Sequence, residues 1–428
     1  MKIPFLSTRN SSKIRLLLLS LVGFSISPIL AQTYGCRDVN ATNYNASATA
    51  NDGSCVYSVT NYTPTFVTTF NSTLDENSAL TIVNDKFWTL NDSGNRNALY
   101  QVSATNGAIL RTVIIKNAVN NDWESLAQSS THLFIGDFGN NDGTRQNLRI
   151  LKISKNDLTN SLNDSIEAEF IDFAYSDQSS FNSTPNATNF DGEALLFAND
   201  SLHIFSKNWA NLRTRHYRLS ANAGSSIATL QEEFNVAGLI TDASISPVTG
   251  NVVLLGYKNN GAGVYNCFSW LLFDYHNTSF FSGNKRLIEL GSGVILGQTE
   301  GISLNSDNTG FFTSEKVPNP YIQIPPKLHI FNFNSYFGSF PVAIKDLSDK
   351  QPYSIVYLNA TNEELTIETN QNSEPTNYVI RNLFGQTLKQ GKLTEAKTLI
   401  NLSNNPSGSY LVSIAGSKSK TVKIMKNR

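Results

Sequence analysis

Residues with oxygen-bearing side chains recur at the start of short apolar segments along this chain. Four copies of the pattern begin with an acid and one earlier, weaker copy begins with a serine: Ser78, Glu124, Glu193, Asp242 and Glu300. Successive members of this set, here called the anchors, are 46 to 69 residues apart. Repetition at such periods indicates one supersecondary unit that is used several times.

The anchors have the chemistry of a calcium site. Carboxylates that are brought together repel one another, and several cannot stay ionised without compensation. A hard divalent cation removes this repulsion, and oxygen ligands without His or Cys suit Ca²⁺ better than Zn²⁺. The alternative is that the acids bond backbone amides of the neighbouring repeat and only cap strand ends. If a cation binds, the predicted ligands are Ser78, Glu124, Glu193, Asp242 and Glu300.

The repeated unit has the strand content of a propeller blade. Each anchor segment is followed by a second short run bounded by Asn, Asp or Gly, such as 252–258, and usually by two more strand candidates. Four strands per repeat are typical of a β-propeller. The last repeat lacks a fourth strand, and residues 62–70 form a spare strand before Ser78. We therefore predict an all-β chain with a five-bladed β-propeller over residues 60–340, closed by that spare strand.

This architecture predicts which side chains share a rim with the anchors. The start of a first strand lies beside the end of the second strand because the two are antiparallel. Residues two positions before the anchors point the same way, since strands have period two; they are Glu76, Asp122, Asp191, Ile240 and Gln298. The second-strand ends and nearby aromatic residues complete the rim: Asp92, Asp137, Lys207, Lys258, Lys316, Trp209, Tyr257 and Trp123.

Composition and the N-terminal residues predict an exported protein. Residues 1–31 combine basic residues with a mostly apolar run, 16–30, that ends before the small residue Ala31, which is typical of a signal peptide. The run is too short and too interrupted to favour a membrane span. Lys and Arg number 33 against 34 Asp and Glu, with no basic stripe, so the sequence argues against a nucleic-acid partner.

Three cysteines follow the signal segment. Cys36 and Cys55 bracket a module, residues 34–57, that is too small to bury a core, and an oxidising compartment favours their pairing. Cys267 lies in an apolar run and is expected to pack as a small hydrophobic residue. The module resembles the short Gly-Cys/Asn-Tyr-Asn/Asp-Gly-Ser-Cys repeats of Bacteroidetes surface proteins, which again indicates an exported chain.

Residues 62–335 resemble the five-bladed calcium-activated nucleotidase (apyrase) family. That family carries a Ser, two Glu, a Ser and a Glu at the starts of its inner strands around a central Ca²⁺. All anchors match this order except Asp242, which stands where the family has Ser. The chain departs from the family at 206–209, which replaces an Arg-rich loop, and at 136–140, which lacks the expected charged residues. The resemblance implies the propeller and the central Ca²⁺, whereas the catalytic loops differ.

Residues 351–428 predict a second, smaller domain. Short strands alternate there after a polar linker at 341–350, as in an Ig-like β-sandwich. The segments 382–386 and 406–412 and the basic end at 418–428 resemble the C-terminal sorting domain of type IX secretion substrates. The resemblance implies passage through the periplasm and outer membrane with the type IX secretion machinery as partner. The protein is then secreted or displayed at the cell surface, with removal of this domain.

Two functions remain open from the sequence. In the first, the propeller is a binding module whose rim recognises a glycan, a peptide, a phosphate compound or another surface protein, with Lys207, Lys258, Lys316, Trp209 and Tyr257 as contacts. In the second, it is a Ca²⁺-dependent phosphohydrolase in which Asp92 or Asp137 positions water and the lysines clamp phosphate. The fold does not decide between them. The incomplete catalytic set favours the binding module.

Overall fold

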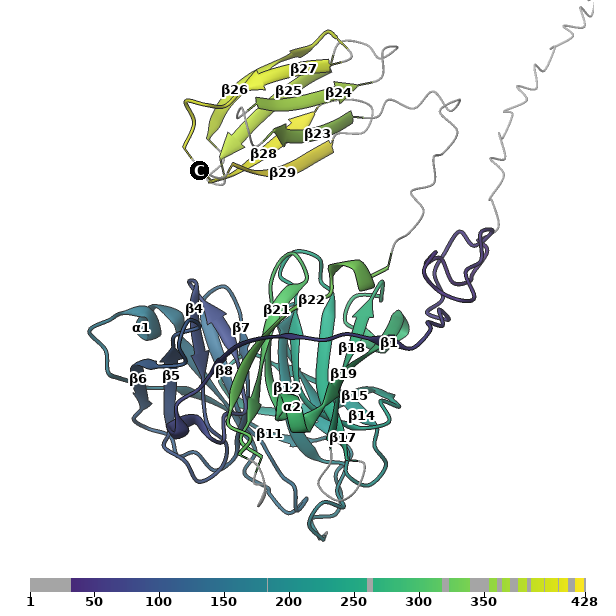
Figure 1. Ribbon diagram of the computed structural model, residues 1–428. Coiled ribbons are helices and arrows are strands. Elements are labelled where there is room, and N and C mark those ends of the chain that lie inside the picture. Colours follow the sequence, from purple (N-terminus) through teal and green to yellow (C-terminus); the bar gives the residue numbers. More distant parts are fainter. Residues whose placement is uncertain are drawn as a thin grey trace, which may run out of the picture. The chain divides into compact units, whose positions relative to one another are not determined.

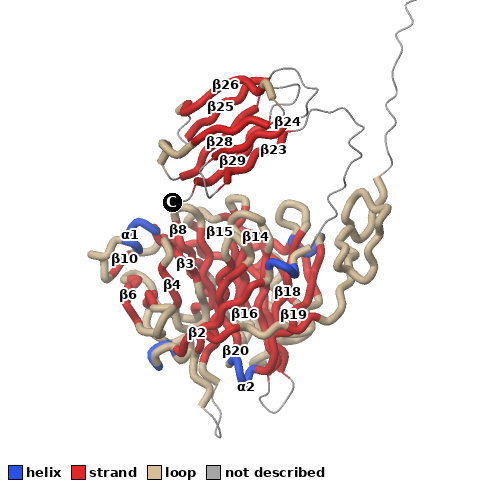
Figure 2. Tube along the Cα trace, turned by 45° about the horizontal axis from the view of Figure 1, so that its top comes forward, coloured by secondary structure: helices blue, strands red, loops and turns tan. Residues whose placement is uncertain are grey.

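The computed structural model is almost entirely strands and loops (Figures 1 and 2). It describes residues 32–182, 184–259, 265–317, 323–338, 354–359, 364–369, 376–382, 386–395, 397–406, 408–414 and 420–426. The chain divides into two compact units, residues 1–341 and 342–428. The predicted signal peptide and the predicted linker lie outside the described residues. The fold is all-β, as the sequence predicts.

The first repeat forms an antiparallel sheet with one added parallel strand. Its order is β10-β6-β5-β4-β3, so consecutive strands from β3 to β6 are neighbours and β10 joins the outer edge. The strands are β3 (Thr81–Val83), β4 (Lys86–Thr89), β5 (Ala98–Val102), β6 (Ile109–Ile115) and β10 (Ser165–Ile166).

The second and third repeats are joined into one eight-stranded sheet. Its order is β12-β13-β14-β15-β11-β9-β8-β7, and the two halves meet where β11 pairs in parallel with β15. The first half contains β7 (Trp123–Gln128), β8 (His132–Asp137), β9 (Arg149–Ser154) and β11 (Glu169–Tyr175). The second contains β12 (Asp191–Ala198), β13 (Ser201–Lys207), β14 (Thr214–Ser220) and β15 (Gly224–Phe234).

The fourth and fifth repeats each take a strand from the start of the chain. The fourth has β16 (Leu239–Ile245), β17 (Val252–Asn259), β18 (Tyr265–Phe273), β19 (Asn284–Ser292) and then β1 (Thr60–Asn61). The fifth has β20 (Gln298–Leu304), β21 (Thr309–Glu315), β22 (Lys327–Asn332) and then β2 (Thr65–Thr69). The pairing of β2 with β22 confirms that the spare strand completes the last repeat. The dark purple segment of Figure 1 carries both added strands.

The first strands of the repeats form an inner ring. β7 contacts β12, β12 contacts β16, β16 contacts β20 and β20 contacts β3. The remaining link is a hydrogen bond from Ser78 Oγ, just before β3, to the carbonyl oxygen of Trp123 in β7 (2.9 Å). Sheets arranged in this way around their first strands make the first unit propeller-like.

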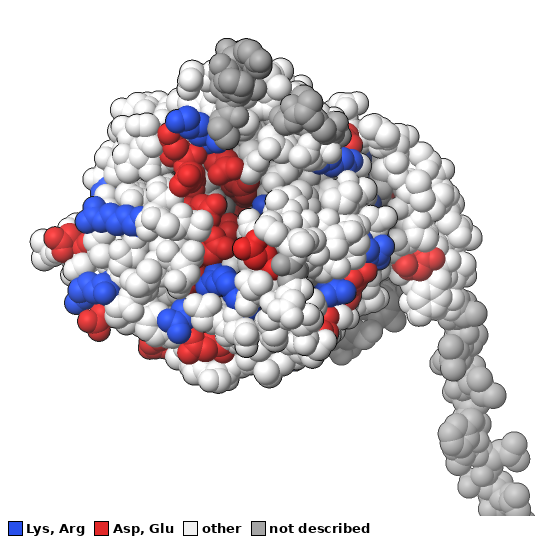
Figure 3. Space-filling view, turned by 90° about the horizontal axis from the view of Figure 1, so that it is seen from below, with Lys and Arg blue, Asp and Glu red and all other residues white. Residues whose placement is uncertain are grey.

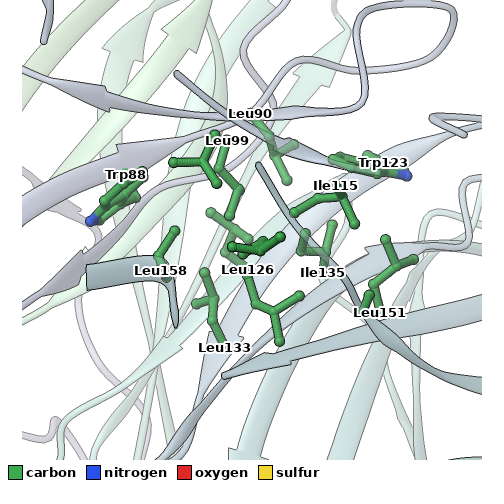
Figure 4. Close-up of a cluster of buried hydrophobic side chains, with 14 of the residues drawn as sticks. Trp88, Leu90, Leu99, Ile115, Trp123, Leu126, Leu133, Ile135, Leu151 and Leu158 are labelled. Atoms are coloured by element: carbon green, nitrogen blue, oxygen red, sulfur yellow. The ribbon is translucent and has the colours of Figure 1, made fainter. Parts of the chain in front are cut away.

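Buried hydrophobic residues fill the spaces between neighbouring sheets. Figure 4 shows the cluster between the first and second repeats, in which Trp88, Leu99 and Ile115 pack against Leu126 and Ile135. The short helix α1 (Lys155–Thr159) adds a fully buried leucine to the same cluster. Further clusters join the second repeat to the third, the third to the fourth and the fourth to the fifth. Packing between sheets therefore holds the inner strands in place.

The N-terminal module is closed by the disulfide that the sequence predicts, Cys36–Cys55. It packs on the fourth repeat, where Asn51 Nδ2 donates to Asn284 Oδ1 (3.1 Å) and the Tyr57 ring lies 6.2 Å from the Phe273 ring. Cys267 is buried, as expected for a small hydrophobic residue. No helix in the described part of the chain is long and apolar enough to cross a membrane.

The second unit consists of two antiparallel sheets around one core. The sheets have the orders β23-β24-β27 and β26-β25-β28-β29. The strands are β23 (Ser354–Asn359), β24 (Glu364–Thr369), β25 (Thr376–Asn382), β26 (Thr387–Leu393), β27 (Lys397–Asn401), β28 (Gly408–Ile414) and β29 (Lys420–Lys426). Ile367 and Ile400 from one sheet are buried with Ile380 and Val412 from the other.

Candidate functional site

The starts of the inner strands carry β-bulges at the anchors. In β7 the pairing register shifts between Trp123 and Ser125, so Glu124 has no partner residue in β8. The same shift leaves Glu193 unpaired in β12, and the shifted stretch of β20 contains Glu300. A bulge adds an unpaired residue and redirects its side chain. The bulges thus release three glutamates from the sheet register at one end of the ring.

The fourth inner strand has its bulge one residue earlier than the sequence alignment implies. The register of β16 shifts between Ile240 and Asp242, so Thr241 is the unpaired residue. Asp242 is buried one position further on, where its Oδ1 accepts from Ser125 Oγ (2.6 Å) and its Oδ2 from the Ile302 N–H (2.8 Å). Asp242 is repelled by Glu300, but both of its carboxylate oxygens already have protein donors. It caps a neighbouring strand, which is the alternative role considered for the anchors.

Three carboxylates converge at the mouth of the ring and form what we call the acidic triad: Asp92, Asp122 and Glu124. One oxygen from each lies within 4.8 Å of the other two. Glu124 is only 6% exposed, and its carboxylate accepts no hydrogen bond from any residue that the structure describes. Figure 3 shows acidic side chains gathered in the hollow at the centre of this face.

A glycine makes room for the acidic triad. A Cβ added at Gly139 would lie 2.3 Å from Glu124 Oε1 and 2.5 Å from Asp122 Oδ2. Both distances are far below van der Waals contact, so any larger residue here displaces the two carboxylates. Asp122 was expected to point the same way as Glu124, and the structure confirms that the two meet.

An internal cation stands beside the acidic triad. Lys207 is buried at the end of β13, and its Nζ donates to Glu193 Oε1 (2.9 Å). Two aromatic rings flank the ammonium group, with centroids 5.1 Å away in Trp209 and 5.6 Å away in Tyr257. The sequence placed these four residues on one rim, and the structure brings them together. Lys207 therefore neutralises one of the three bulge glutamates.

The remaining acids of the mouth have protein donors. Gln298 Nε2 donates to Glu300 Oε1 (2.7 Å) and also to Glu315. Asp191 is fully buried, and its Oδ2 accepts from Trp209 Nε1 (2.7 Å). Among the buried carboxylates of the mouth within the described residues, Glu124 is thus the one without a donor.

Burial and mutual repulsion raise the pKa values of these acids. Desolvation, with repulsion from Asp92 and Asp191, raises the pKa of Asp122 to about 7. Desolvation with repulsion from Asp92 raises the pKa of Glu124 well above its usual range. Burial likewise raises the pKa of Glu300 to about 7. The pKa of Lys207 is raised because the surrounding carboxylates outweigh its burial, so it stays charged.

Two predicted rim lysines point away from the mouth. Asp191 and Gln298 each lie two positions before an anchor. Asp191 pairs with Lys207 in the next strand and Gln298 pairs with Glu315, so Glu315 is the equivalent of Lys207 in β21. Lys316 follows Glu315 by one residue, so strand alternation turns it to the other face, where its Nζ bonds Asp75 (2.7 Å). Lys258 bonds Glu289 at 3.2 Å.

Two further predicted residues have structural partners. Asp137 is fully buried; its Oδ1 accepts from the Asp122 N–H (3.1 Å) and from Arg145 (3.0 Å), and its Oδ2 accepts from Asn121 (3.0 Å). Ser78 donates to Trp123 as described above. Of the two candidate catalytic acids, only Asp92 lies in the acidic triad.

The residues present fit a hard cation, but with a different ligand set from the one that the resemblance implies. Ser78 and Asp242 already bond protein groups, and Glu193 is paired with Lys207. The acidic triad offers three carboxylates and no nitrogen or sulfur ligand, which is the donor chemistry of Ca²⁺. The sequence predicted Lys316 rather than Glu315 as the rim residue of this repeat. The residue that pairs with Gln298, two positions before the anchor Glu300, is Glu315, so the alternation of strand side chains identifies it.

The second unit matches a known protein family. Residues 355–427 match the family described as "Secretion system C-terminal sorting domain". The protein is therefore a type IX secretion substrate, secreted or displayed at the cell surface. A search of the curated proteins found no match.

Solved structures give distant similarities to two thirds or more of the chain. PorZ, a surface component of the type IX secretion system of Porphyromonas gingivalis, is 13% identical with a TM-score of 0.29; the match covers 82% of this chain and 45% of PorZ, so less than half of that protein is spanned. An exo-β-1,3-galactanase from Phanerochaete chrysosporium is 10% identical, covers 86% of this chain and 98% of its own, and has a TM-score of 0.38. A mannose phosphorylase from Leishmania mexicana is 12% identical over 67% of this chain and 95% of its own, with a TM-score of 0.39.

Proposed function

We propose that this chain is an exported, calcium-dependent binding module in which the five repeats act as five propeller blades and the acidic triad holds Ca²⁺. One observation carries the proposal: Glu124 is a buried carboxylate without a hydrogen-bond donor among the described residues, and it faces two other carboxylates. Desolvation and repulsion from the neighbouring carboxylates disfavour the ionised form of Glu124, so without a cation it tends to take up a proton. A bound divalent cation offers the alternative that keeps all three groups ionised.

The chemistry of the mouth supports Ca²⁺ over other metals. Ca²⁺ takes six to eight oxygen ligands, and carboxylates are its usual protein ligands. The acidic triad would supply its oxygens from the first and second repeats, at one edge of the mouth. The remaining coordination positions would face the open hollow of Figure 3. Oxygen atoms of an extracellular ligand can take those positions, so the cation itself becomes the contact for the ligand.

The second candidate function, phosphoanhydride hydrolysis, has weaker support. Lys258 and Lys316 bond acids elsewhere, and Arg145 bonds Asp137. Lys207 remains near the acidic triad, but Glu193 already pairs with it. Hydrolysis needs cationic groups that stabilise charge on the transferring phosphoryl group. The binding module therefore accounts better for the charges at this mouth.

Thermal unfolding of the full chain in EDTA and then in millimolar Ca²⁺ tests the proposal. A ligand that binds only the native state stabilises it by about 2.7 kcal/mol at ~100 times its Kd. We expect the melting temperature to rise in Ca²⁺, and we expect Glu124→Gln and Gly139→Ala to remove the rise. Asp242→Asn is the matched control and keeps it. No rise in the wild type overturns the cation, and Ca²⁺-dependent release of phosphate from a nucleoside diphosphate favours the hydrolase.

A further inference from the structure

A second cavity opens at the opposite ends of the inner strands. The acidic triad lies where these strands start, whereas this cavity of about 810 Å³ is lined by the second halves of β3, β7, β12, β16 and β20 and by the turns that follow them. Its volume falls in the range of about 300–1,000 Å³ that small-molecule sites occupy. The two openings are separate features of one ring, and the cavity takes no part in the proposed cation site.

The lining of this cavity has one positive and one negative residue, and its other polar groups are uncharged. Lys155 and Asp307 are its two charged lining residues, and both are engaged. Lys155 Nζ donates to the Ser129 carbonyl oxygen (2.6 Å), and Asp307 Oδ1 accepts from the N–H (3.1 Å) and the hydroxyl (2.6 Å) of Thr309. Both charged side chains therefore already have a hydrogen-bond partner in the protein. A phosphate or carboxylate ligand would therefore find no dedicated counter-charge, so the cavity suits an uncharged ligand.

Neutral hydrogen-bonding groups converge on the cavity from different inner strands. Ser303 in β20 is 7% exposed, and its hydroxyl has no partner among the described residues. Thr81 Oγ1 accepts from Gln128 Nε2 (3.0 Å), and Ser244 Oγ accepts from the Leu304 N–H (2.9 Å). A hydroxyl that accepts still has its own proton to donate. The lining thus offers several hydroxyl donors besides its two charged residues.

An aromatic ring stands in the same wall. Phe197 is half-buried, lines the cavity and is stacked on Phe134, with centroids 5.6 Å apart and planes 10° apart. The stack fixes the orientation of the Phe197 ring. Aliphatic side chains, among them Leu195 and Ile302, supply further apolar surface. A ligand for this wall needs an apolar face together with several hydroxyl groups.

We propose that this cavity binds the end of a neutral oligosaccharide. A pyranose ring has a C–H face that packs on an aromatic ring and equatorial hydroxyls that exchange hydrogen bonds with Ser, Thr and Gln side chains. The Ser303 hydroxyl lines the cavity, and a sugar hydroxyl can take the place of water as its hydrogen-bond partner. Because most polar groups of the lining are uncharged, we expect a sugar without acid or phosphate groups. Export to the cell surface brings the cavity into contact with extracellular glycans.

Saturation-transfer NMR and calorimetry on the full chain in EDTA test this inference. The probes are short neutral oligosaccharides: β-linked gluco-, galacto- and xylo-oligosaccharides and α-linked manno-oligosaccharides. We expect at least one to bind with a millimolar or lower Kd, and Ser303→Val and Phe197→Leu each to weaken it about tenfold. Glu124→Gln is the control and leaves sugar binding unchanged, because it lies at the other mouth.

Three results overturn the inference. The first is the absence of binding by every probe at ~10 mM, a concentration at which millimolar complexes are well populated. The second is binding that survives both cavity variants, which places the sugar elsewhere. The third is binding that is lost in Glu124→Gln, which places the sugar at the acidic mouth. Unfolding curves of Ser303→Val, which replaces the hydroxyl by a larger apolar side chain, separate loss of binding from loss of fold.

Discussion

The two ends of the inner strands differ although the same five strands build both. At their starts, bulges release Glu124, Glu193 and Glu300 from the sheet register, and acids crowd together. At their ends the pairing is regular and the lining groups are hydroxyls, amides and apolar side chains. Strain and unpaired charge are costly, and they collect at sites where function requires them. The acidic mouth has the crowded charges, whereas the two charged residues that line the cavity have protein partners.

Between the two ends, short polar side chains join each inner strand to the next. Ser125 Oγ accepts from the Leu195 N–H (3.0 Å), and Thr241 Oγ1 donates to the Thr299 carbonyl oxygen (2.8 Å). These bonds satisfy the free backbone edge that each first strand presents. Asp242 also bonds groups of the neighbouring inner strands, so it belongs with these structural residues even though it is an acid like those of the mouth. The difference between structural and functional acids is therefore a matter of hydrogen-bond partners.

The largest effect on stability is expected from the structural acid. Asp242→Ala leaves the Ile302 N–H and the Ser125 hydroxyl without their buried acceptor. We expect a loss of about 3 kcal/mol in the free energy of unfolding, since each buried unsatisfied group costs ~1–3 kcal/mol. Urea denaturation in EDTA measures it. Glu124→Ala, at a site without donors, is expected to cost far less; equal losses for the two variants would remove the distinction.

A smaller effect is expected from the internal cation. Lys207→Gln removes the ammonium group from Glu193 and lowers the free energy of unfolding in EDTA by about 2 kcal/mol, less than for a full truncation because Gln still donates a hydrogen bond. The same change makes the mouth more negative, so the stabilisation by Ca²⁺ should grow. Denaturation with and without Ca²⁺ measures both. A variant whose response to Ca²⁺ is unchanged would mean that Lys207 does not influence the cation site.

The smallest expected effect is the change in the free energy of unfolding per pH unit in the cation-free protein. The pKa values of Asp122 and Glu300 are about 7 in the folded chain, against 3.8 and 4.5 for the free side chains. The folded state therefore holds more protons than the unfolded state between these values, and stability falls as pH rises through that window. The slope is at most about 1.4 kcal/mol per pH unit for each carboxyl.

Buried histidines oppose this slope below about pH 6.5. Burial lowers the pKa values of His203 and His329 to about 3 and about 4, so the unfolded state binds more protons there and stability rises with pH. The contribution of the acidic mouth is therefore measured as the difference in melting temperature between the wild type and Asp122→Asn in EDTA. We expect this difference to change with pH between about 5 and about 7, in the direction that disfavours the wild type as pH rises, and saturating Ca²⁺ should weaken that change by holding the carboxylates ionised. A difference that is independent of pH in EDTA would contradict the raised pKa of Asp122.

The sequence predicted the strands better than it predicted the site. The run 252–258 was expected as a strand, and β17 (Val252–Asn259) occupies it, because an apolar, β-branched run ends at turn residues there. Closure by 65–69 followed from a missing strand and a spare one. Strand β26 was missed because it alternates leucine with lysine, glutamine and glycine, and the added strands β1 and β10 have only two residues each.

The site required the register of hydrogen bonds, which sequence spacing does not contain. A bulge at Thr241 rather than Asp242 moves one acid out of the mouth, and one step of alternation separates Glu315 from Lys316. Such one-residue shifts reverse the direction of a side chain. The sequence did identify three residues of the mouth, because their motifs mark the position to within one residue: Glu124, Glu193 and Lys207.

Calorimetric titration of Ca²⁺ into the full chain near pH 7 tests the central claim most directly. We predict one bound Ca²⁺ per chain with release of protons from the acidic triad, detected as a dependence of the heat on the ionisation enthalpy of the buffer. Glu124→Gln should abolish this binding, and Asp242→Asn should retain it. Binding that survives in Glu124→Gln, or that disappears in a folded Asp242→Asn variant, would contradict the assignment of the cation to Asp92, Asp122 and Glu124.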